Sequence, residues 1–315
     1  ATLAGLPWRP ENGRGVRMFC DITRPDGSVF EADTRHLLQQ AIEDAQNLGY
    51  SFSFGAEMEF YLFKTDESGE PTQEPYDHAG YMDIAPADKG ENVRREICLT
   101  LEQMGIRPES SHHEEGPGQN EIDFRYSDPL TAADNAVTFR SVVQTIAARS
   151  GLWADFSPKP LSDAPGSGLH INLSVHGGVD TEPQVIAGLL RHAYDITAFL
   201  NPSRESYLRL GSRKAPGFIT WSSQNRSQLI RVPAAEGEYR RVELRVPRSN
   251  RQSLYRVCAA DLCGSRWFSP QASPAAQHGF ESLRGASGAV GGFSPSASVL
   301  RGGAGGSGIQ RLCAG

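Results

Sequence analysis

One stretch of the chain, residues 51–63, constrains the fold more than any other. It is rich in aromatic residues, and Glu57 and Glu59 interrupt it two positions apart. Side chains at i and i+2 of a strand share one face, so the two carboxylates point the same way. Two carboxylates this close repel one another unless a cation lies between them. The sequence therefore predicts a largely buried strand that carries either a cation site or a solvated acidic face.

Helical and strand patterns follow one another as far as residue 247. Apolar spacing closed by Gly49, Gly105 and Gly151 predicts three helices, since glycine commonly ends a helix. The expected helices span 34–48, 92–104, 130–150 and 185–199, and the expected strands span 16–22, 28–30, 51–63, 121–126, 169–175, 228–233 and 240–246. This mixture indicates an α+β fold. Several of these strands carry polar residues on one face, as the wall of a site would.

A second acidic segment runs from Glu114 to Glu121. A tight Gly-Pro-Gly loop at 116–118 brings these two carboxylates back toward one another. Hard divalent cations such as Mg²⁺ bind oxygen ligands, so the pair indicates a cation site, with a common acidic loop as the alternative. The neighbouring polar residues are expected to be solvated or to lie behind the ligands: His112, His113 and Glu115.

A glycine loop at residues 166–168 precedes another predicted strand. Glycine lets a ligand approach the backbone closely. His170 and Asn172 share one face of the strand that follows. A lone histidine is more often structural than a ligand, so both interpretations stay open at this point.

The last predicted strand places Arg241, Glu243 and Arg245 on one face. Two guanidinium groups around a carboxylate form either an ion-pair ladder or a metal-binding glutamate between two anion-binding arginines, because arginine binds phosphate and carboxylate bidentately. Arg226 and Arg231 lie nearby in the sequence. Neither GxxxxGK[ST] nor GxGxxG occurs, so a nucleotide has to be held by metals and arginines.

In this order, the motifs resemble those of glutamine synthetase. The matching strings stand at 55–60 (GAEMEF), 118–121 (GQNE), 158–160 (PKP), 166–170 (GSGLH), 201–202 (NP), 206–210 (SYLRL), 225–227 (NRS) and 241–245 (RVELR). Each string alone is modest, but their fixed order is specific. The resemblance runs from about Gly15 to Pro247.

The resemblance implies a glutamine synthetase-type catalytic domain, an antiparallel sheet forming an active-site half-barrel flanked by helices. Residues 1–32 would be the remnant of an N-terminal β-grasp domain, 33–247 a partial catalytic domain and 248–315 a disordered tail. The chain would then be a central piece that lacks both ends of the full protein. In the intact family a homo-oligomeric ring is expected, with the N-terminal domain completing the neighbouring subunit's site.

The resemblance also implies roles for individual residues. One divalent cation, Mg²⁺ or Mn²⁺, would be held by Glu59, Glu114 and Glu121, and the other by Glu57, His170 and Glu243. The phosphates of ATP and the transferring phosphoryl group would be held by Arg226, Arg231 and Arg241, with Asn172 and Ser174 also contacting ATP. The carboxylates of the amino-acid substrate would be held by Arg209, Arg245 and the Gly166 backbone. Arg226, Arg241 and Glu243 are the residues expected to act in catalysis.

The implied reaction is ATP-dependent ligation of ammonia to the γ-carboxylate of glutamate through γ-glutamyl phosphate. Two positions depart from the family pattern. Lys214 stands where the family commonly has a glutamate that is thought to take a proton from ammonium, and Pro165 stands where an asparagine is common. A cation at position 214 repels ammonium. Ligation of a larger, polyamine-type amine is therefore one alternative, and an inactive truncated fragment is the other.

Composition narrows the classes of partner. The net charge of -6 provides no basic field for nucleic acid. No apolar run approaches the roughly 20 residues that cross a bilayer. Five cysteines without a CxxC pair favour a reducing cytoplasm over a disulfide framework. The first residue is Ala1 rather than methionine, which we interpret as a fragment or a processed chain.

The composition changes after about Arg248, where Ser, Gly, Ala, Arg and Gln dominate and no sustained period remains. Codons for 248–267 can be chosen that, read one base later, encode Asp-Pro-Thr-Ala-Asn-Pro-Tyr and an apolar helix, as the family would continue. We therefore predict that 248–315 is an out-of-frame translation. Coding DNA whose shifted frame does not encode that string would contradict this prediction.

Overall fold

The computed structural model describes residues 2–9, 12–178 and 181–247 of the chain. Within them, nine strands form one sheet in the order β5-β6-β3-β8-β11-β10-β9, with β4 and β7 paired to β3 outside this path. Neighbouring strands are antiparallel except β9 and β10, which are parallel. The predicted α+β class is confirmed, and the sheet is mixed and, over the described residues, does not close into a barrel.

The elements have the following bounds. The strands are β1 (Ala4–Gly5), β2 (Val16–Arg17), β3 (Ser51–Thr65), β4 (Pro71–Pro75), β5 (Pro108–His113), β6 (Gln119–Ser127), β7 (Leu152–Asp155), β8 (Leu169–His176), β9 (Trp221–Ser222), β10 (Ile230–Arg231) and β11 (Val242–Leu244). The helices are α1 (Thr34–Asn47), α2 (Glu91–Gln103), α3 (Pro129–Arg149), α4 (Thr181–Leu200) and α5 (Arg204–Arg209), with a 3-10 turn at Gly237–Tyr239.

Local signals explain where the helices begin and end. The Asp33 side chain accepts the N–H of Arg35 at the start of α1, and Asp128 caps α3 in the same way. Gly49 and Gly151 follow the ends of these helices with φ of 83° and 70°, a conformation that glycine adopts without a steric penalty. The predicted helices are confirmed within a few residues at each end.

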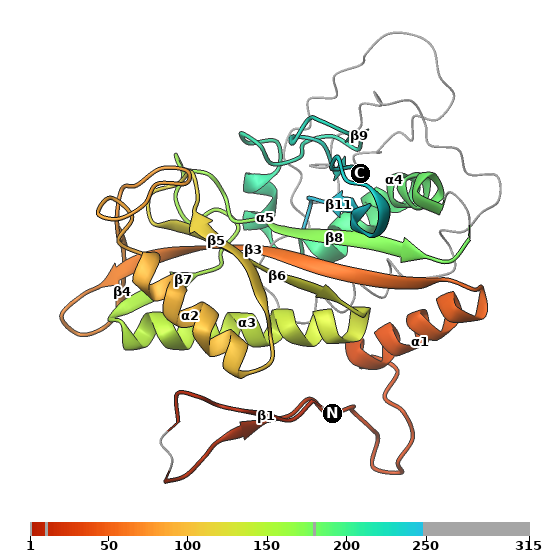
Figure 1. The fold of residues 1–315 in the computed structure, drawn as a ribbon, viewed down its shortest axis with the longest axis horizontal. Coiled ribbons are helices and arrows are strands. Elements are labelled where there is room, and N and C mark those ends of the chain that lie inside the picture. Colours follow the sequence, from red (N-terminus) through yellow and green to blue (C-terminus); the bar gives the residue numbers. More distant parts are fainter. Residues whose placement is uncertain (1, 10–11, 179–180, 248–315) are drawn as a thin grey trace.

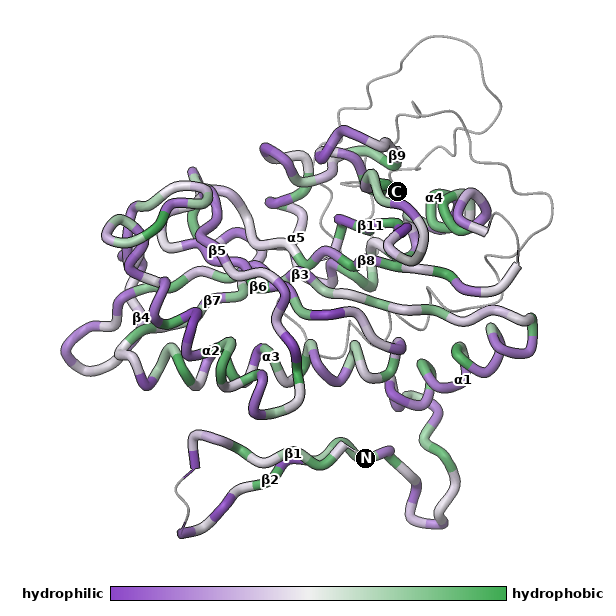
Figure 2. Tube along the Cα trace, viewed as in Figure 1, coloured by the Kyte–Doolittle hydropathy of each residue, from purple (hydrophilic) through white to green (hydrophobic). Residues whose placement is uncertain are grey.

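The sheet separates two layers of helices. In Figure 1, α1, α2 and α3 lie on one side of β3 and β6, and α4 and α5 lie on the other side. On the α3 side the rings of Phe60, Phe139 and Phe156 pack against one another, with centroids 5.5 to 6.3 Å apart. Figure 2 shows β3 and α3 with hydrophobic stretches along this interface. Because side chains alternate along a strand, Glu57 and Glu59 point to the opposite face from Phe60.

The N-terminal segment forms a small separate pairing. Ala4 pairs with Arg17 and Gly5 with Val16, and Thr23 and Val29 form an isolated bridge. The expected loop at 1–16 thus contains β1, and the expected strand at 16–22 ends at Arg17. In Figure 1 this segment lies beyond the layer of α1, α2 and α3. Its assignment as a β-grasp remnant stays a prediction.

Two predicted strands, at 228–233 and 240–246, are shorter in the structure than expected, since pairing is limited to β10 and β11. The predicted tail at 248–315, including the out-of-frame interpretation, lies outside the described residues. No helix among the described residues combines the length and the apolar character needed to span a bilayer.

Candidate active site

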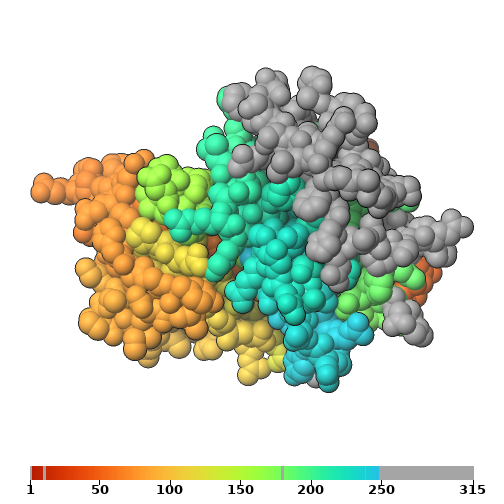
Figure 3. All heavy atoms as spheres, turned by 90° about the horizontal axis from the view of Figure 1, so that it is seen from above, coloured from red at the N-terminus to blue at the C-terminus, as the bar shows by residue number. Residues whose placement is uncertain are grey.

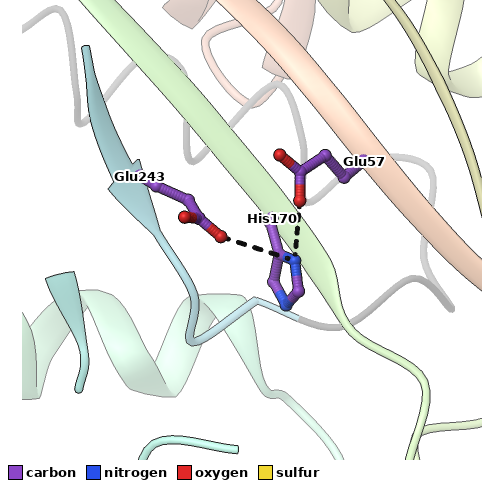
Figure 4. A group of neighbouring side chains, drawn as sticks. All are labelled: Glu57, His170 and Glu243. Atoms are coloured by element: carbon purple, nitrogen blue, oxygen red, sulfur yellow. Dashed lines mark hydrogen bonds and ion pairs between the residues drawn. The ribbon is translucent and has the colours of Figure 1, made fainter. Parts of the chain in front are cut away.

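Strand register brings together residues that lie far apart in the sequence. Glu57 on β3 stands opposite His170 on β8, and Glu243 on β11 stands opposite Asn172, two positions further along β8. The Nδ1 atom of His170 lies 3.0 Å from Glu57 Oε2 and 3.6 Å from Glu243 Oε1. Figure 4 shows the three side chains pointing toward one another from three strands. Their ligand atoms lie within 4.8 Å of one another, so this predicted set converges.

The second predicted set is arranged differently. Glu59 and Glu121 stand opposite each other on β3 and β6. They form a group within 4.8 Å together with His170, whose Nε2 lies 3.8 Å from Glu59 Oε1. Glu114 and Glu121 form a separate group with His112. Glu121 therefore links Glu114 to Glu59, and His170 lies between the two sets.

Several acids of the site are buried close to other carboxylates, without enough positive charge around them to balance their own. Burial, then the charges of Glu59, Glu57 and Glu114, raises the pKa of Glu121 well above its usual range. Burial, then Glu121 and Glu57, raises the pKa of Asp123 to about 9. Burial also raises the pKa of Glu114, with Glu59 as the next cause. These carboxyl groups need positive charge in order to ionise together.

The pKa of Glu57 is shifted in the opposite direction from the pKa values of these three acids. Burial acts to raise its pKa, but hydrogen bonds from His170 and Asn172 outweigh this effect and lower the pKa to about 2. Asn172 Nδ2 donates to Glu57 Oε1 at 2.7 Å, and Arg241 Nε donates to Asn172 Oδ1 at 2.9 Å. The amide of Asn172 thus joins the carboxylate of β3 to the guanidinium that precedes β11.

Arginines surround the other end of the cluster. Glu243 is fully buried, accepts from Arg231 Nη1 at 2.9 Å and forms a further ion pair with Arg245. Arg209 is 2% exposed, and its Nη2 donates to the carbonyl oxygens of Val246 and Pro247 at 2.6 and 2.8 Å. The predicted anion-binding residues therefore lie around Glu243, with Arg209 already held by backbone carbonyls.

A cavity of about 220 Å³ opens above these residues. Most of the predicted site residues line it: Glu57, Glu59, Glu114, Glu121, Gly166, His170, Arg209, Arg226, Arg231 and Arg245. A second cavity of about 180 Å³ is lined by Ser174 and Arg241, and β8 contributes residues to the lining of both cavities. Viewed from above, Figure 3 shows residues 200–247 meeting the surface of the first half of the chain.

Glycine is required where the cavity wall is tightest. A Cβ atom on Gly166 would clash with the carbonyl oxygen of Pro158 and lie 2.6 Å from Arg209 Cγ. A side chain at this position would displace the arginine or the loop. The glycine loop expected from the sequence therefore packs closely against Arg209.

The two departures from the family pattern lie at the rim. Lys214 forms an ion pair with Glu115, and its Nζ lies 5.5 Å from the centre of the Tyr81 ring. Pro165 presents its carbonyl oxygen to the Tyr61 hydroxyl at 2.6 Å. Glu115 was expected to be solvated or to lie behind the ligands, and it is partly exposed and paired with the lysine.

His113 was also expected to be solvated or to lie behind ligands, and the first expectation is wrong. It is fully buried, and its Nε2 lies 2.8 Å from Asp77 Oδ1. Its Nδ1 lies 2.6 Å from the carbonyl oxygen of Glu114. His113 is the last residue of β5, a strand that the sequence did not predict, and its burial departs from the alternation of that strand, in which Glu109 and Ser111 are exposed.

Sequence reasoning missed six residues that line the cavity: Tyr81, Gln119, Asp123, Ser212, Arg213 and Ala215. Gln119 and Asp123 flank Glu121 at two-residue spacing on β6, so the parity that singled out Glu57 and Glu59 could have found them. The ring of Tyr81 packs edge-on against His112, with centroids 5.6 Å apart. No local pattern in the sequence identifies Tyr81, whereas Ala215 lies in the string that carries Lys214.

Comparison with known proteins agrees with the resemblance found in the sequence motifs. A family model described as "Glutamine synthetase, catalytic domain" matches residues 31–264. The chain belongs to the glutamine synthetase family. The match extends beyond the boundary predicted at residue 247, and the out-of-frame interpretation of the tail stays a prediction.

Curated relatives in this family share close to half of the aligned residues. A protein named glutamine synthetase from Clostridium saccharobutylicum is 49% identical over 257 residues, covering 77% of this chain and 58% of the relative. One of the same name from Methanosarcina mazei is 46% identical over 262 residues, covering 78% of this chain and 59% of the relative. The chain therefore spans less than two thirds of the length of these relatives.

A solved structure shares the fold. The cryoEM structure of Plasmodium falciparum glutamine synthetase superposes with a TM-score of 0.77 at 23% identity, covering 87% of this chain and 62% of that one. The glutamine synthetase-type fold expected from the sequence is confirmed.

Proposed function

We propose that this chain carries the catalytic domain of an ATP-dependent ligase that joins ammonia to the γ-carboxylate of glutamate. The observation that carries the proposal is the convergence of Glu57, His170 and Glu243 from three strands, beside Glu59 and Glu121, at a wall of arginines. A γ-carboxylate is a poor electrophile because its oxygen is a poor leaving group. An enzyme that activates it with ATP needs cations around phosphate, and this site supplies them.

The donor set fits divalent cations. Carboxylate oxygens and one imidazole are suitable ligands for Mg²⁺ or Mn²⁺, and the raised pKa of Glu121 shows that its neighbours lack balancing positive charge. Glu57, His170 and Glu243 would hold one cation, and Glu59 and Glu121, with Glu114 at the entrance, the other. Bound there, the cations supply neutralisation of the phosphate oxygens of ATP.

The arginines have two different roles in this proposal. Arg226 and Arg231 line the main cavity and would bind the γ-phosphoryl group, whose charge is spread over three oxygens during transfer. Arg245 and Arg209 are buried, with Arg209 packed against Gly166, and would orient the carboxylates of glutamate. Such positioning contributes by holding the two reactants at attack distance.

The second cavity suits the remainder of the nucleotide. It is lined from β8, which also contributes His170 to the main cavity, and Arg241 and Ser174 line it. Arg241 bonds to Asn172, which bonds to Glu57. ATP bound with its phosphates at the arginines would extend over this edge of β8, in contact with Asn172 and Ser174.

The proposed reaction has two balanced steps. An oxygen of the γ-carboxylate attacks the γ-phosphorus of ATP, a P–O bond forms, and the bond to ADP breaks. The nitrogen of ammonia then attacks the acyl carbon of γ-glutamyl phosphate, a C–N bond forms, phosphate leaves, and one proton is released. The family's homo-oligomeric ring remains a prediction for this chain.

Lys214 favours a second candidate, ligation of a larger amine. It is a rim residue that already forms an ion pair with Glu115 and faces Tyr81. A cation at the entrance disfavours ammonium, which keeps an amine other than ammonium as a candidate substrate.

Phosphate release tests both candidates. The intact chain is incubated with ATP, glutamate and Mg²⁺, and inorganic phosphate is measured with ammonium or with an aliphatic diamine. Amine-dependent release with ammonium supports glutamine formation, and release with the diamine alone supports the second candidate. No glutamate-dependent release with either amine contradicts the proposed ligase and favours the inactive fragment.

A further inference from the structure

Gln119 opens β6 and lies almost completely buried in the cavity floor, at 1% exposure. Its Nε2 donates to Glu59 Oε2 at 3.0 Å and to the Gly166 carbonyl oxygen at 3.3 Å. Its Oε1 accepts from the N–H of Gly116 at 2.9 Å and from the Tyr61 hydroxyl at 3.3 Å. One side-chain amide thus joins three separate segments that form the cavity.

The partners determine the orientation of this amide. The N–H of Gly116 can only donate, and the carbonyl oxygen of Gly166 can only accept. Exchanging the amide oxygen and nitrogen would place donor against donor and acceptor against acceptor in a buried site. The Nε2 group therefore faces Glu59.

This hydrogen bond decides which oxygen of Glu59 is left for a ligand. Oε2 accepts from Gln119 and also from the Gly168 N–H at 2.9 Å. Oε1 points toward His170, whose Nε2 lies 3.8 Å away, within the group that includes Glu121. With two donors on one oxygen, the carboxylate presents the other oxygen in a fixed direction.

The same amide reaches the glycine loop. It binds the carbonyl oxygen of Gly166, and the Tyr61 hydroxyl donates to the preceding Pro165 carbonyl oxygen at 2.6 Å. A Cβ atom on Gly116 would clash with that hydroxyl and lie 2.8 Å from Gln119 Oε1. The space around the amide is therefore filled, and the loop cannot shift without breaking these contacts.

We propose that Gln119 is a positioning residue that fixes the Glu59 carboxylate and the Gly166 loop relative to one another. This role rests on the proposed function, since it supposes that Glu59 binds a divalent cation and that Gly166 borders the amino acid. In this role Gln119 acts on the reactants only through these two neighbours. It acts through the direction of a carboxylate and the place of a loop.

The test is binding of Mn²⁺ alone to the full chain, measured by calorimetry. Gln119→Met keeps the length of the side chain and removes its donors and acceptor. Gln119→Glu adds a negative charge at the same place. If Gln119 acts by position, both variants bind Mn²⁺ about 10- to 100-fold more weakly than the parent chain. The matched controls are Gln103→Met and Gln103→Glu at an exposed glutamine of α2, with affinity unchanged.

The following outcomes would contradict the proposed role of Gln119. Unchanged affinity in the folded Gln119 variants overturns it while leaving the proposed function intact. Tighter binding by Gln119→Glu with unchanged binding by Gln119→Met shows a plain charge effect and also overturns it. Loss of the folded state in both variants, seen by circular dichroism, assigns Gln119 to the core instead. A parent chain that binds no Mn²⁺ overturns the proposed cation site together with this role.

Discussion

Two groups of acids and histidines in this structure differ in how their charges are balanced. One is the acidic cluster of Glu57, Glu59, Glu121, Glu243 and His170 beside the cavity. The other, here named the balanced network, consists of Asp77, Asp88, Arg94 and His113, with each member at most 4% exposed. The ligand atoms of both groups approach closely enough to hold a metal ion. Proximity alone therefore does not separate a site from a structural network.

Hydrogen-bond partners separate the two. Asp88 forms a two-point ion pair with Arg94 at 3.1 and 2.5 Å. Asp77 accepts from the N–H groups of Lys89 and Gly118 and lies against His113. Burial tends to raise the pKa of Asp77, but the bond to His113, the charge of that histidine and the N–H groups of Lys89 and Ala79 together lower it. Every charge in the balanced network has an opposite charge beside it.

The acidic cluster lacks this compensation. The pKa of Glu121 is raised by burial and by three other carboxylates, whereas His170 bonds to Glu57 on one side. Burying like charges costs stability, which a protein retains where the charges serve a ligand. The comparison predicts that changes in the balanced network affect folding, and changes in the acidic cluster affect binding and turnover.

The largest expected effect is on activity, in the acidic cluster. Glu243→Gln keeps the size of a fully buried side chain and removes its charge from between Arg231 and Arg245. We expect glutamate-dependent phosphate release and cation-dependent ATP binding to fall by at least ~100-fold. Glu236→Gln, at an exposed position before the 3-10 turn, is the control and should leave both unchanged. Equal loss in the two variants would remove Glu243 from the site.

The next effect is on stability, in the balanced network. Asp88→Asn leaves the Arg94 guanidinium buried without its counter-charge. We expect the free energy of unfolding, measured by urea titration, to fall by about 3 kcal/mol. Asp195→Asn, on an exposed position of α4, should change it by less than about 0.5 kcal/mol. A stable Asp88→Asn variant that loses Mn²⁺ binding would reverse the assignment of the two groups.

A smaller effect concerns pH. Folding raises the pKa of Asp123 from 3.8 to about 9, through burial and then Glu121 and Glu57. The folded state therefore binds more protons than the unfolded state within that window, so this group lowers stability as pH rises through it. We expect the metal-free chain to lose stability on going from acid to neutral pH, and Asp123→Asn to reduce the slope. Thermal unfolding at a series of pH values measures this, and identical slopes would contradict it.

The smallest stability effect is expected at the rim. The Lys214 and Glu115 side chains are 53% and 29% exposed, so their ion pair contributes no more than about 1 kcal/mol. Lys214→Ala should leave the unfolding transition nearly unchanged and lower the KM for ammonium several-fold, because a repelling charge is removed. A KM that does not change would show that Lys214 has no part in the choice of amine.

Parts of this arrangement could be predicted from the sequence because they follow from local rules. Period-2 alternation placed Glu57 and Glu59 on one face of β3, and glycines marked the ends of the first helices. β5 and β7 were missed because one is a polar serine and histidine segment and the other has four residues, which carry no readable period. His113, on β5, was undervalued for the same reason, whereas Gln119 shares the parity of Glu121 on β6 and could have been found from it.

Local spacing in the sequence could not predict how the two expected sets of metal ligands meet. Glu57, His170 and Glu243 meet through the register of β3, β8 and β11, which depends on the whole sheet. A one-residue shift of β8 would turn His170 to the opposite face. Family resemblance supplied the grouping that spacing alone left open, although it did not anticipate that His170 lies between both sets.

A crystal of the full chain soaked in Mn²⁺ and measured by anomalous scattering tests the central claim most directly. The account predicts anomalous peaks between His170, Glu57 and Glu243 and beside Glu59 and Glu121, and none at Asp77, Asp88 and His113. Peaks at the balanced network, or no peak at the acidic cluster in the presence of bound Mn²⁺ elsewhere, would contradict it.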